Sequence, residues 1–208
     1  MKVLATLTLL LGLAAPAGAH DSPLAAEDIR DHLWDHGDRD ALAARLGDRL
    51  ATRTFRGEGS AVKGALAVGV VEAPLKSVLK VVKAYEDYRH LLKFCTSSAI
   101  LDQEGAKTQV HIKISIANGA VKLWANVAFQ ESSRGDVTVV EAALEEGNMK
   151  RLDARWELAA IDPGRTLVMM RLLVDPDLAL ASDAKATELN QVNARRAIRA
   201  VRERVRLY

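Results

Sequence analysis

The sequence lacks most of the features that identify common functional classes at sight. It has a single cysteine, Cys95, so no disulfide can form within the chain and the fold must be held by its hydrophobic core. Lys+Arg 29 and Asp+Glu 27 nearly cancel, and the net charge of +2 argues against a nucleic-acid-binding module. Hydrophobic residues make up 49% of the 208 positions, which argues against a disordered chain. A folded globular protein is therefore expected.

Motifs for cofactor, metal or nucleophilic chemistry are also missing. The sequence has no GxSxG elbow, Walker loop, dinucleotide-binding fingerprint or CxxC pair. His32 and His36 are one helical turn apart, a spacing that can hold a metal, but no strict motif such as HExxH accompanies them. Cys95 follows Phe94 and lies near Leu91 and Leu92, which favours a buried thiol over a reactive one. We predict no cofactor and no metal site.

The first residues have the organisation of a secretory signal peptide. Lys2 gives a positive start, residues 3–15 are almost entirely apolar, and Ala17-Gly18-Ala19 is a small-x-small cleavage signature. An uncleaved anchor is the alternative, but the apolar run is shorter than the ~20 residues that span a bilayer. We expect residues 1–19 to be a signal peptide cleaved after Ala19, and the protein to be periplasmic or secreted.

The next segment, residues 20–60, is predicted to be an N-terminal helical extension. Leu42, Leu46 and Leu50 recur every four residues, and Gly37 is expected to divide the stretch from Ser22 to Thr52 into two short helices. A loop over 56–60, with Gly57 and Gly59, then leads into residues 61–208. The role of the extension is not evident from its residues.

Residues 61–208 contain strand, helix and turn signals in a clear order. Residues 61–73 form an apolar stretch that suits a strand, and residues 74–92 have the spacing of a helix. Turn pairs then recur at intervals of 13 to 16 residues, which predicts an antiparallel meander: Glu104-Gly105, Asn118-Gly119, Arg134-Gly135, Gly147-Asn148 and Pro163-Gly164. Apolar side chains alternate with polar ones such as His111, Arg155 and Glu157. One sheet face is therefore expected to be apolar and the other to meet water.

A long helix is predicted over residues 182–206. Its apolar stripe includes Ala194, Ala197, Ile198 and Val201, and it needs an apolar partner, which the one-sided sheet supplies. These elements predict an α+β fold in which a curved antiparallel sheet wraps around the C-terminal helix.

This order of elements resembles the helix-grip fold of the START-like superfamily, also called SRPBCC. YEDYRHLL from Tyr85, followed by SSAIL from Ser97, is similar to the Tyr-rich segment before the second strand of polyketide cyclase-like and coenzyme Q-binding-like members. GNMKRLDARWEL from Gly147 and GRTLVMMRLLVDPD from Gly164 resemble their two late strands. The resemblance covers residues 61–206. It implies a cavity between the sheet and the last helix that binds a hydrophobic small molecule such as a lipid, sterol, isoprenoid or quinone-like compound.

The resemblance, together with the strand alternation, points to a set of cavity-lining residues. They are Tyr85, Tyr88, Ile112, Ile114, Leu123, Val127, Trp156, Asn190 and Ile198. Aromatic residues are only 4% of the chain, which favours an aliphatic or isoprenoid ligand over a stacked planar one. If the two apolar faces instead pack tightly, the same residues are simply core.

Several polar residues on these elements have two interpretations each. Thr187 and Asn190 either orient a ligand or lie at the solvent-exposed start of the helix. Arg171 interrupts an apolar strand pattern and either binds an acidic head group or reaches water at a sheet edge. Arg195, Arg199, Arg202 and Arg206 form a stripe that is either a solvated face or a transient contact with an anionic membrane.

Two alternatives to a carrier remain. The same scaffold supports cyclase, aromatase or hydratase enzymes, and a titratable group facing the cavity would favour that class. An envelope interaction module is the third hypothesis, and a filled core with an exposed apolar patch on the N-terminal helices would favour it.

Overall fold

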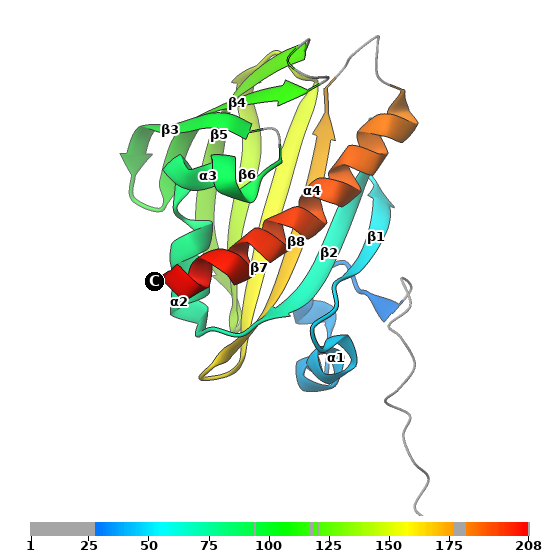
Figure 1. The fold of residues 1–208 in the computed structure, drawn as a ribbon, viewed down its shortest axis with the longest axis vertical. Coiled ribbons are helices and arrows are strands. Elements are labelled where there is room, and N and C mark those ends of the chain that lie inside the picture. Colours follow the sequence, from blue (N-terminus) through cyan, green and yellow to red (C-terminus); the bar gives the residue numbers. More distant parts are fainter. Residues whose placement is uncertain (1–27, 94, 117–118, 120, 177–181, 208) are drawn as a thin grey trace, which may run out of the picture.

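The strand signals of the sequence form one antiparallel sheet in the computed structural model, which describes residues 28–93, 95–116, 119, 121–176 and 182–207. The strands are β1 (Ala51–Arg56), β2 (Lys63–Val71), β3 (Cys95–Glu104), β4 (Lys107–Ile116), β5 (Val121–Arg134), β6 (Val137–Gly147), β7 (Arg151–Asp162) and β8 (Arg165–Asp175). Their order is β1-β2-β8-β7-β6-β5-β4-β3, so β2 pairs with the last strand (Figure 1).

Turn residues connect the strands at the predicted places. Gly105 and Gly135 take positive φ angles of 58° and 62° between β3 and β4 and between β5 and β6, a conformation that favours glycine. The predicted turns at 147–148 and 163–164 also lie between successive strands. Asn118 of the fifth predicted turn, like the predicted signal peptide, lies outside the described residues.

The long C-terminal helix α4 (Asp183–Arg204) crosses the concave, inner face of the sheet (Figure 1). Ser182 caps it, because its side chain accepts a hydrogen bond from the Lys185 amide. Irregular pairing between β3 and β4, between β5 and β6 and between β7 and β8 is of the bulge type that bends a sheet. The predicted α+β helix-grip fold is thus confirmed.

Short helices cover one end of the inner face. They are α2 (Leu75–Val82), the 3-10 turn η3 (Tyr85–Asp87) and α3 (Tyr88–Leu91). The prediction of one continuous helix over 74–92 is wrong, because the chain turns at Lys83 and Ala84. That turn places the rings of Tyr85 and Tyr88 against Phe129 of β5, with centroid distances of 4.5 and 5.4 Å.

The N-terminal segment contains two short helical elements and, unexpectedly, a strand. The helical elements are η2 (Leu33–Asp35) and α1 (Arg39–Leu46), on either side of Gly37 as predicted. The helical prediction up to Thr52 is wrong: β1 starts at Ala51 and pairs with β2 along its whole length, from Ala51 opposite Val68 to Arg56 opposite Lys63. Pairing with the open edge of β2 overrides the weak helical pattern there.

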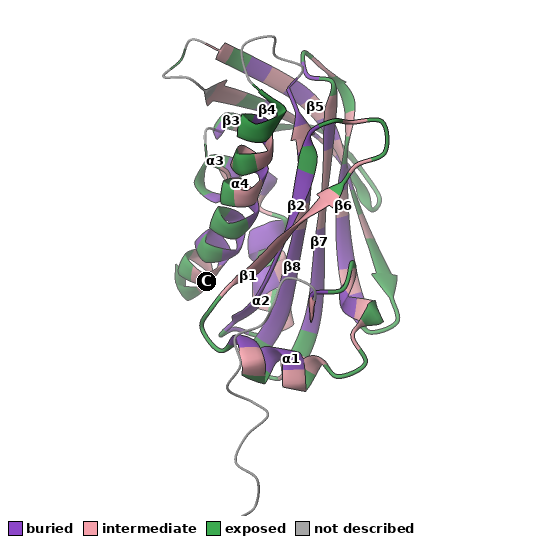
Figure 2. Cartoon of the chain, turned by 90° about the vertical axis from the view of Figure 1, so that its right-hand side faces the viewer, coloured by how far each residue is buried: buried purple, intermediate pink, exposed green. Residues whose placement is uncertain are grey.

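The outer face of the sheet carries a second hydrophobic layer, which the N-terminal segment covers (Figure 2). Its members come from η2, α1, β2, β6, β7 and β8 and include Leu33, Leu42, Leu46, Leu66, Val68, Val137, Leu167 and Met169. The prediction that this face meets water is therefore wrong for these strands. Strand β2, which has nine residues, is consequently buried on both faces from Gly64 onwards.

The buried carboxylate of Glu157 holds the N-terminal segment on the outer face of the sheet. Glu157 of β7 is 1% exposed, accepts a hydrogen bond from the Leu33 amide at 2.6 Å and lies 2.7 Å from His32 Nδ1. His32 stacks on Trp34 with ring centroids 4.1 Å apart, and the Arg155 guanidinium lies 3.8 Å from the Glu157 carboxylate. The sequence pattern had placed Glu157 in water, whereas it anchors the N-terminal segment.

Candidate functional site

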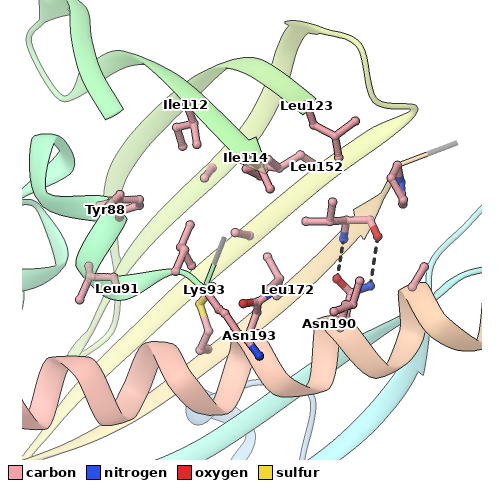
Figure 3. Close-up of a pocket in the computed structure, with 18 of the residues that line it drawn as sticks. Tyr88, Leu91, Lys93, Ile112, Ile114, Leu123, Leu152, Leu172, Asn190 and Asn193 are labelled. Atoms are coloured by element: carbon pink, nitrogen blue, oxygen red, sulfur yellow. Dashed lines mark hydrogen bonds between the residues drawn. The ribbon is translucent and has the colours of Figure 1, made fainter. Parts of the chain in front are cut away.

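A narrow cavity lies between the inner face of the sheet and α4, with α3 at one end (Figure 3). Its volume is about 80 Å³. The strand walls consist of Ile112, Ile114, Leu123, Phe129, Ala142, Leu152, Ala154, Trp156, Met170, Leu172 and Val174. Tyr88, Leu91, Leu92 and Lys93 border it from the α3 region, and Ala186, Leu189, Asn190 and Asn193 from α4. The walls are therefore almost wholly aliphatic and aromatic.

Strand periodicity explains why these side chains converge. Alternate residues of β4, β5, β7 and β8 point to the same face, and the antiparallel register sets Ala154 opposite Leu172 and Trp156 opposite Met170. Small residues such as Ala142 and Ala154 leave space that α4 does not fill. The cavity follows from this combination of large and small side chains on one curved face.

Six of the nine residues predicted to line a cavity border this one. They are Tyr88, Ile112, Ile114, Leu123, Trp156 and Asn190. The other three pack elsewhere in the inner layer. The Tyr85 ring packs at a tilt against the Phe129 ring, Val127 is fully buried within the inner hydrophobic layer, and Ile198 faces β2. Ile198 lies near Gly69 of β2, where an added Cβ would be 3.6 Å from Ile198 Cγ2, whereas the same Cβ would come within 2.2 Å of Leu50 Cδ2.

Asn190 lines the cavity but uses its amide to join elements. It is 2% exposed. Its Oδ1 accepts from the Val174 amide at 3.1 Å, and its Nδ2 donates to the carbonyls of Lys63 and Val174 at 3.1 and 3.2 Å. Thr187 Oγ1 accepts from the Lys63 amide at 3.0 Å. Asn190 therefore does not lie at a solvent-exposed helix start, and both side chains hold α4 against β2 or β8.

Asn193 lies one turn further along α4 and behaves differently. It borders the cavity next to Lys93 and Leu172 (Figure 3). Its Oδ1 is buried and has no hydrogen-bond partner in the described part of the chain. A signal for this residue exists in the sequence, since Asn190 and Asn193 are three positions apart and so share a helix face.

Ionisable chemistry at the cavity is limited. Among the described lining residues there is no Asp, Glu, His or Cys, and the titratable groups are Tyr88 and Lys93. Burial raises the pKa of Tyr88 well above 10, and its hydroxyl donates to the Val82 carbonyl at 2.8 Å. Lys93 is exposed at the rim. A neutral phenol and a surface ammonium do not form an acid–base pair that works near pH 7.

The other candidate residues have separate roles. Cys95 is buried as predicted, and burial raises the pKa of its thiol to about 11. His111 lies on the outer face, where Nδ1 is 2.7 Å from Asn126 Oδ1. His36 accepts from the Arg30 amide while His32 contacts Glu157, and no group of three potential metal ligands occurs in the described residues.

The arginine residues are not equivalent. Arg171 is not at a sheet edge, because β8 lies between β2 and β7, and its partly exposed side chain lies on the outer face, 3.7 Å over the Phe55 ring and 3.6 Å from Asp31. Arg202 turns inward and donates to the carbonyls of Val70 and Asp48, both at 2.7 Å. Arg195, Arg199 and Arg206 are exposed. The predicted stripe is therefore interrupted at Arg202.

Comparisons with known proteins agree with this geometry. Residues 71–201 match the family model described as polyketide cyclase / dehydrase and lipid transport. No curated protein is similar enough in sequence to match. In the described part of the chain, no helix has the length and apolar character that crossing a membrane requires.

Solved structures share the fold at low sequence identity. The STAR-related lipid transfer protein from Xanthomonas axonopodis matches with a TM-score of 0.66 and 15% identity, over 76% of this chain and 93% of that chain. The human StAR-related lipid transfer protein 5 matches with a TM-score of 0.63 and 10% identity, over 76% of this chain and 82% of that chain. The Zhui aromatase/cyclase from a Streptomyces species matches with a TM-score of 0.53 and 14% identity, over 74% of this chain and 94% of that chain.

Proposed function

This chain belongs to the polyketide cyclase / dehydrase and lipid transport family, and from that premise we propose that it binds and carries an aliphatic or isoprenoid small molecule. The family and the fold indicate either hydrophobic-ligand binding or polyketide cyclisation. The observation that carries the proposal is the lining of the cavity. Its described walls offer apolar side chains and no carboxylate or imidazole.

A binding role fits this lining better than a cyclase, aromatase or hydratase role. Those reactions need a group that gives or takes a proton near neutral pH. Tyr88 stays protonated because burial raises its pKa, and its hydroxyl is already engaged by the Val82 carbonyl. An apolar wall instead retains hydrophobic compounds by excluding water.

The size of the cavity shapes the proposal. At about 80 Å³ it is far smaller than the ~300–1,000 Å³ of sites that hold drug-sized ligands. Its walls are therefore close together here, and a larger ligand enters as flexible side chains such as Leu172 and Met170 move apart. Short or slender aliphatic compounds require the least movement.

Location and delivery are further parts of the proposal. The signal-peptide pattern of residues 1–19 supports action in the periplasm or outside the cell. Exposed Arg195, Arg199 and Arg206 support a transient contact with an anionic membrane surface, at about 1 kcal/mol for each arginine. Arg202 does not contribute, because backbone carbonyls hold its guanidinium.

Two neighbouring alanines of β6 provide the test. Ala142 borders the cavity and Ala143 is exposed on the outer face, so Ala142→Leu fills the cavity while Ala143→Leu adds the same atoms outside it. We expect organic extracts of the wild-type protein and of A143L, purified from the native compartment, to contain a stoichiometric aliphatic compound by mass spectrometry. The A142L extract should contain much less of it.

A clean wild-type extract, with no uptake of aliphatic compounds on later incubation, would contradict the carrier role. Equal loading of A142L and A143L would show that the compound binds elsewhere. Circular dichroism of both variants checks that each is folded.

A further inference from the structure

The polar atoms that border the cavity are almost all engaged by the protein itself. The Asn190 amide makes three hydrogen bonds to the backbone of β2 and β8. The Tyr88 hydroxyl donates to the Val82 carbonyl at 2.8 Å. These groups have little remaining capacity to bind a ligand, so they contribute shape and apolar surface.

Asn193 is the exception among the described lining residues. Its Oδ1 is buried without a partner, although it lies on the same helix face as the fully engaged Asn190. A buried acceptor that no longer hydrogen-bonds to water and has no protein partner destabilises the fold, and native structures contain few such atoms. The side chain extends from α4 toward the cavity, between Lys93 and the Leu172 side of the sheet (Figure 3).

A ligand that restores the missing hydrogen bond must carry a donor at the end of an apolar body. A hydroxyl group has this property, and it also accepts, so it suits the amide whichever of its two polar atoms faces the ligand. A carboxylate has no proton to donate to Oδ1. Apart from the engaged amide of Asn190 and Lys93 at the exposed rim, the wall around Asn193 is apolar, which favours a ligand with one such group near α4.

We infer that the ligand is an aliphatic alcohol whose hydroxyl binds Asn193 and whose hydrocarbon part lies against Ile112, Leu172 and Trp156. This inference rests on the proposed binding function and names its ligand class. Asn193 acts as the specificity-determining residue of the cavity, whereas Asn190, three residues earlier, holds the helix in place.

Two probes of similar length test the inference: 1-octanol, which carries a hydroxyl, and 1-chlorooctane, which does not donate. Headspace gas chromatography over protein solutions gives the free concentration of each, and hence its affinity for the wild-type protein, Asn193→Leu and Gln191→Leu. Gln191 is an amide on the same helix that does not border the cavity, so Q191L is the matched control.

We expect the ratio of octanol to chlorooctane affinity to fall about tenfold in N193L and to stay unchanged in Q191L, as the loss of one buried hydrogen bond implies. Thermal unfolding of the ligand-free proteins provides a second measurement. N193L should melt at or above the wild-type temperature, because the substitution removes a buried acceptor that has no partner.

The possible results separate the inference from the function on which it rests. If both probes bind and N193L keeps the wild-type ratio, the hydroxyl assignment is wrong while hydrophobic binding stands. A melting temperature of N193L several degrees below wild type would assign the amide a structural role and overturn the inference. If neither probe binds the wild-type protein, the proposed function fails, and the ligand class fails with it.

Discussion

The sheet has two hydrophobic layers, one on each face, and they differ in how their polar groups are used. On the outer face, the buried Glu157 carboxylate is engaged by His32 and the Leu33 amide, and the N-terminal segment is fixed over the strands. On the inner face, α4 leaves a cavity of about 80 Å³ bordered by the unpartnered Asn193 Oδ1. The polar groups over Glu157 are engaged in holding the N-terminal segment, whereas the wall of the inner cavity includes a buried acceptor, Asn193 Oδ1, without a partner in the described residues.

This difference assigns a role to the N-terminal segment. Without η2 and α1, the outer face would expose residues such as Leu66, Val68 and Met169, all of which are fully buried. The outer cover therefore buries apolar area that is separate from the inner cavity. Four experiments would break or sharpen this contrast.

The largest effect is expected from Glu157→Ala. It leaves the Leu33 amide without an acceptor and His32 without its carboxylate, so we expect the free energy of unfolding to fall by about 3 kcal/mol. Urea denaturation measures the loss, and amide hydrogen exchange should show faster exchange at Leu33. Glu157→Gln keeps an acceptor and should lose less. Unchanged exchange in E157A would contradict the anchoring role.

Met169 and Met170 are adjacent on β8 and face opposite layers. Met169 is fully buried in the outer layer, and Met170 borders the cavity. We expect Met169→Ala to cost about 3 kcal/mol without affecting ligand uptake, and Met170→Ala to cost about 2 kcal/mol while admitting bulkier ligands. Urea denaturation of both variants measures the two stability costs, and ligand uptake by both shows whether only Met170→Ala changes binding. Equal costs and equal uptake would remove the distinction between the layers.

Asn190→Leu tests the structural amide of α4. The substitution removes three partly buried hydrogen bonds to the backbone of Lys63 and Val174, so a loss of about 2 kcal/mol in unfolding free energy is expected. Asn193→Leu is the matched variant, with no expected loss. Similar stability changes in the two variants would show that the amides are equivalent after all.

The last effect is confined to alkaline pH and concerns the inner layer. Burial raises the pKa of Tyr85 to about 12 and that of Tyr88 well above its usual value of 10. Above pH 10 the unfolded chain has lost these protons and the native protein keeps them, so stability falls as pH rises from 10 towards 12, by about 1.4 kcal/mol per pH unit for each group. Urea denaturation at several pH values should show this slope, and Tyr85→Phe should reduce it. An unchanged slope in Y85F would contradict the assignment.

Strand alternation was enough to predict the inner face, since Ile112, Leu123 and Trp156 all point inward. The outer layer could not be predicted in the same way. Arg155 and Glu157 alternate with apolar residues as they would on a solvated face, and only the tertiary position of His32 and Leu33 makes Glu157 buried. The alternation of residues reports only the polarity of the side chains. The burial of Glu157 depends on a segment that lies more than a hundred residues away in the sequence.

The candidate site was predictable in outline and not in detail. Tyr85 and Ile198 have the helical spacing of lining residues, but the turn at Lys83 and the packing of α4 against β2 place them in the inner hydrophobic layer away from the cavity. Asn190 was a sound choice by position, yet its amide is used by the backbone of neighbouring strands. A polar atom on a buried helix face has a hydrogen-bond partner only if a backbone group of a neighbouring strand lies beside it. The spacing of residues in the sequence does not give the position of that strand.

The pairing of β2 with β8 also affects how the chain is made. β2 is buried on both faces, but its partner residues follow about a hundred positions later, with Ala65 opposite Leu172. At a synthesis rate of about 5–20 residues per second, β2 waits about 5–20 s for β8, and α4 emerges later still. During that time an apolar strand is open to pairing with other chains. The edge of β2 that β8 covers therefore stays unpaired until most of the chain has been synthesised.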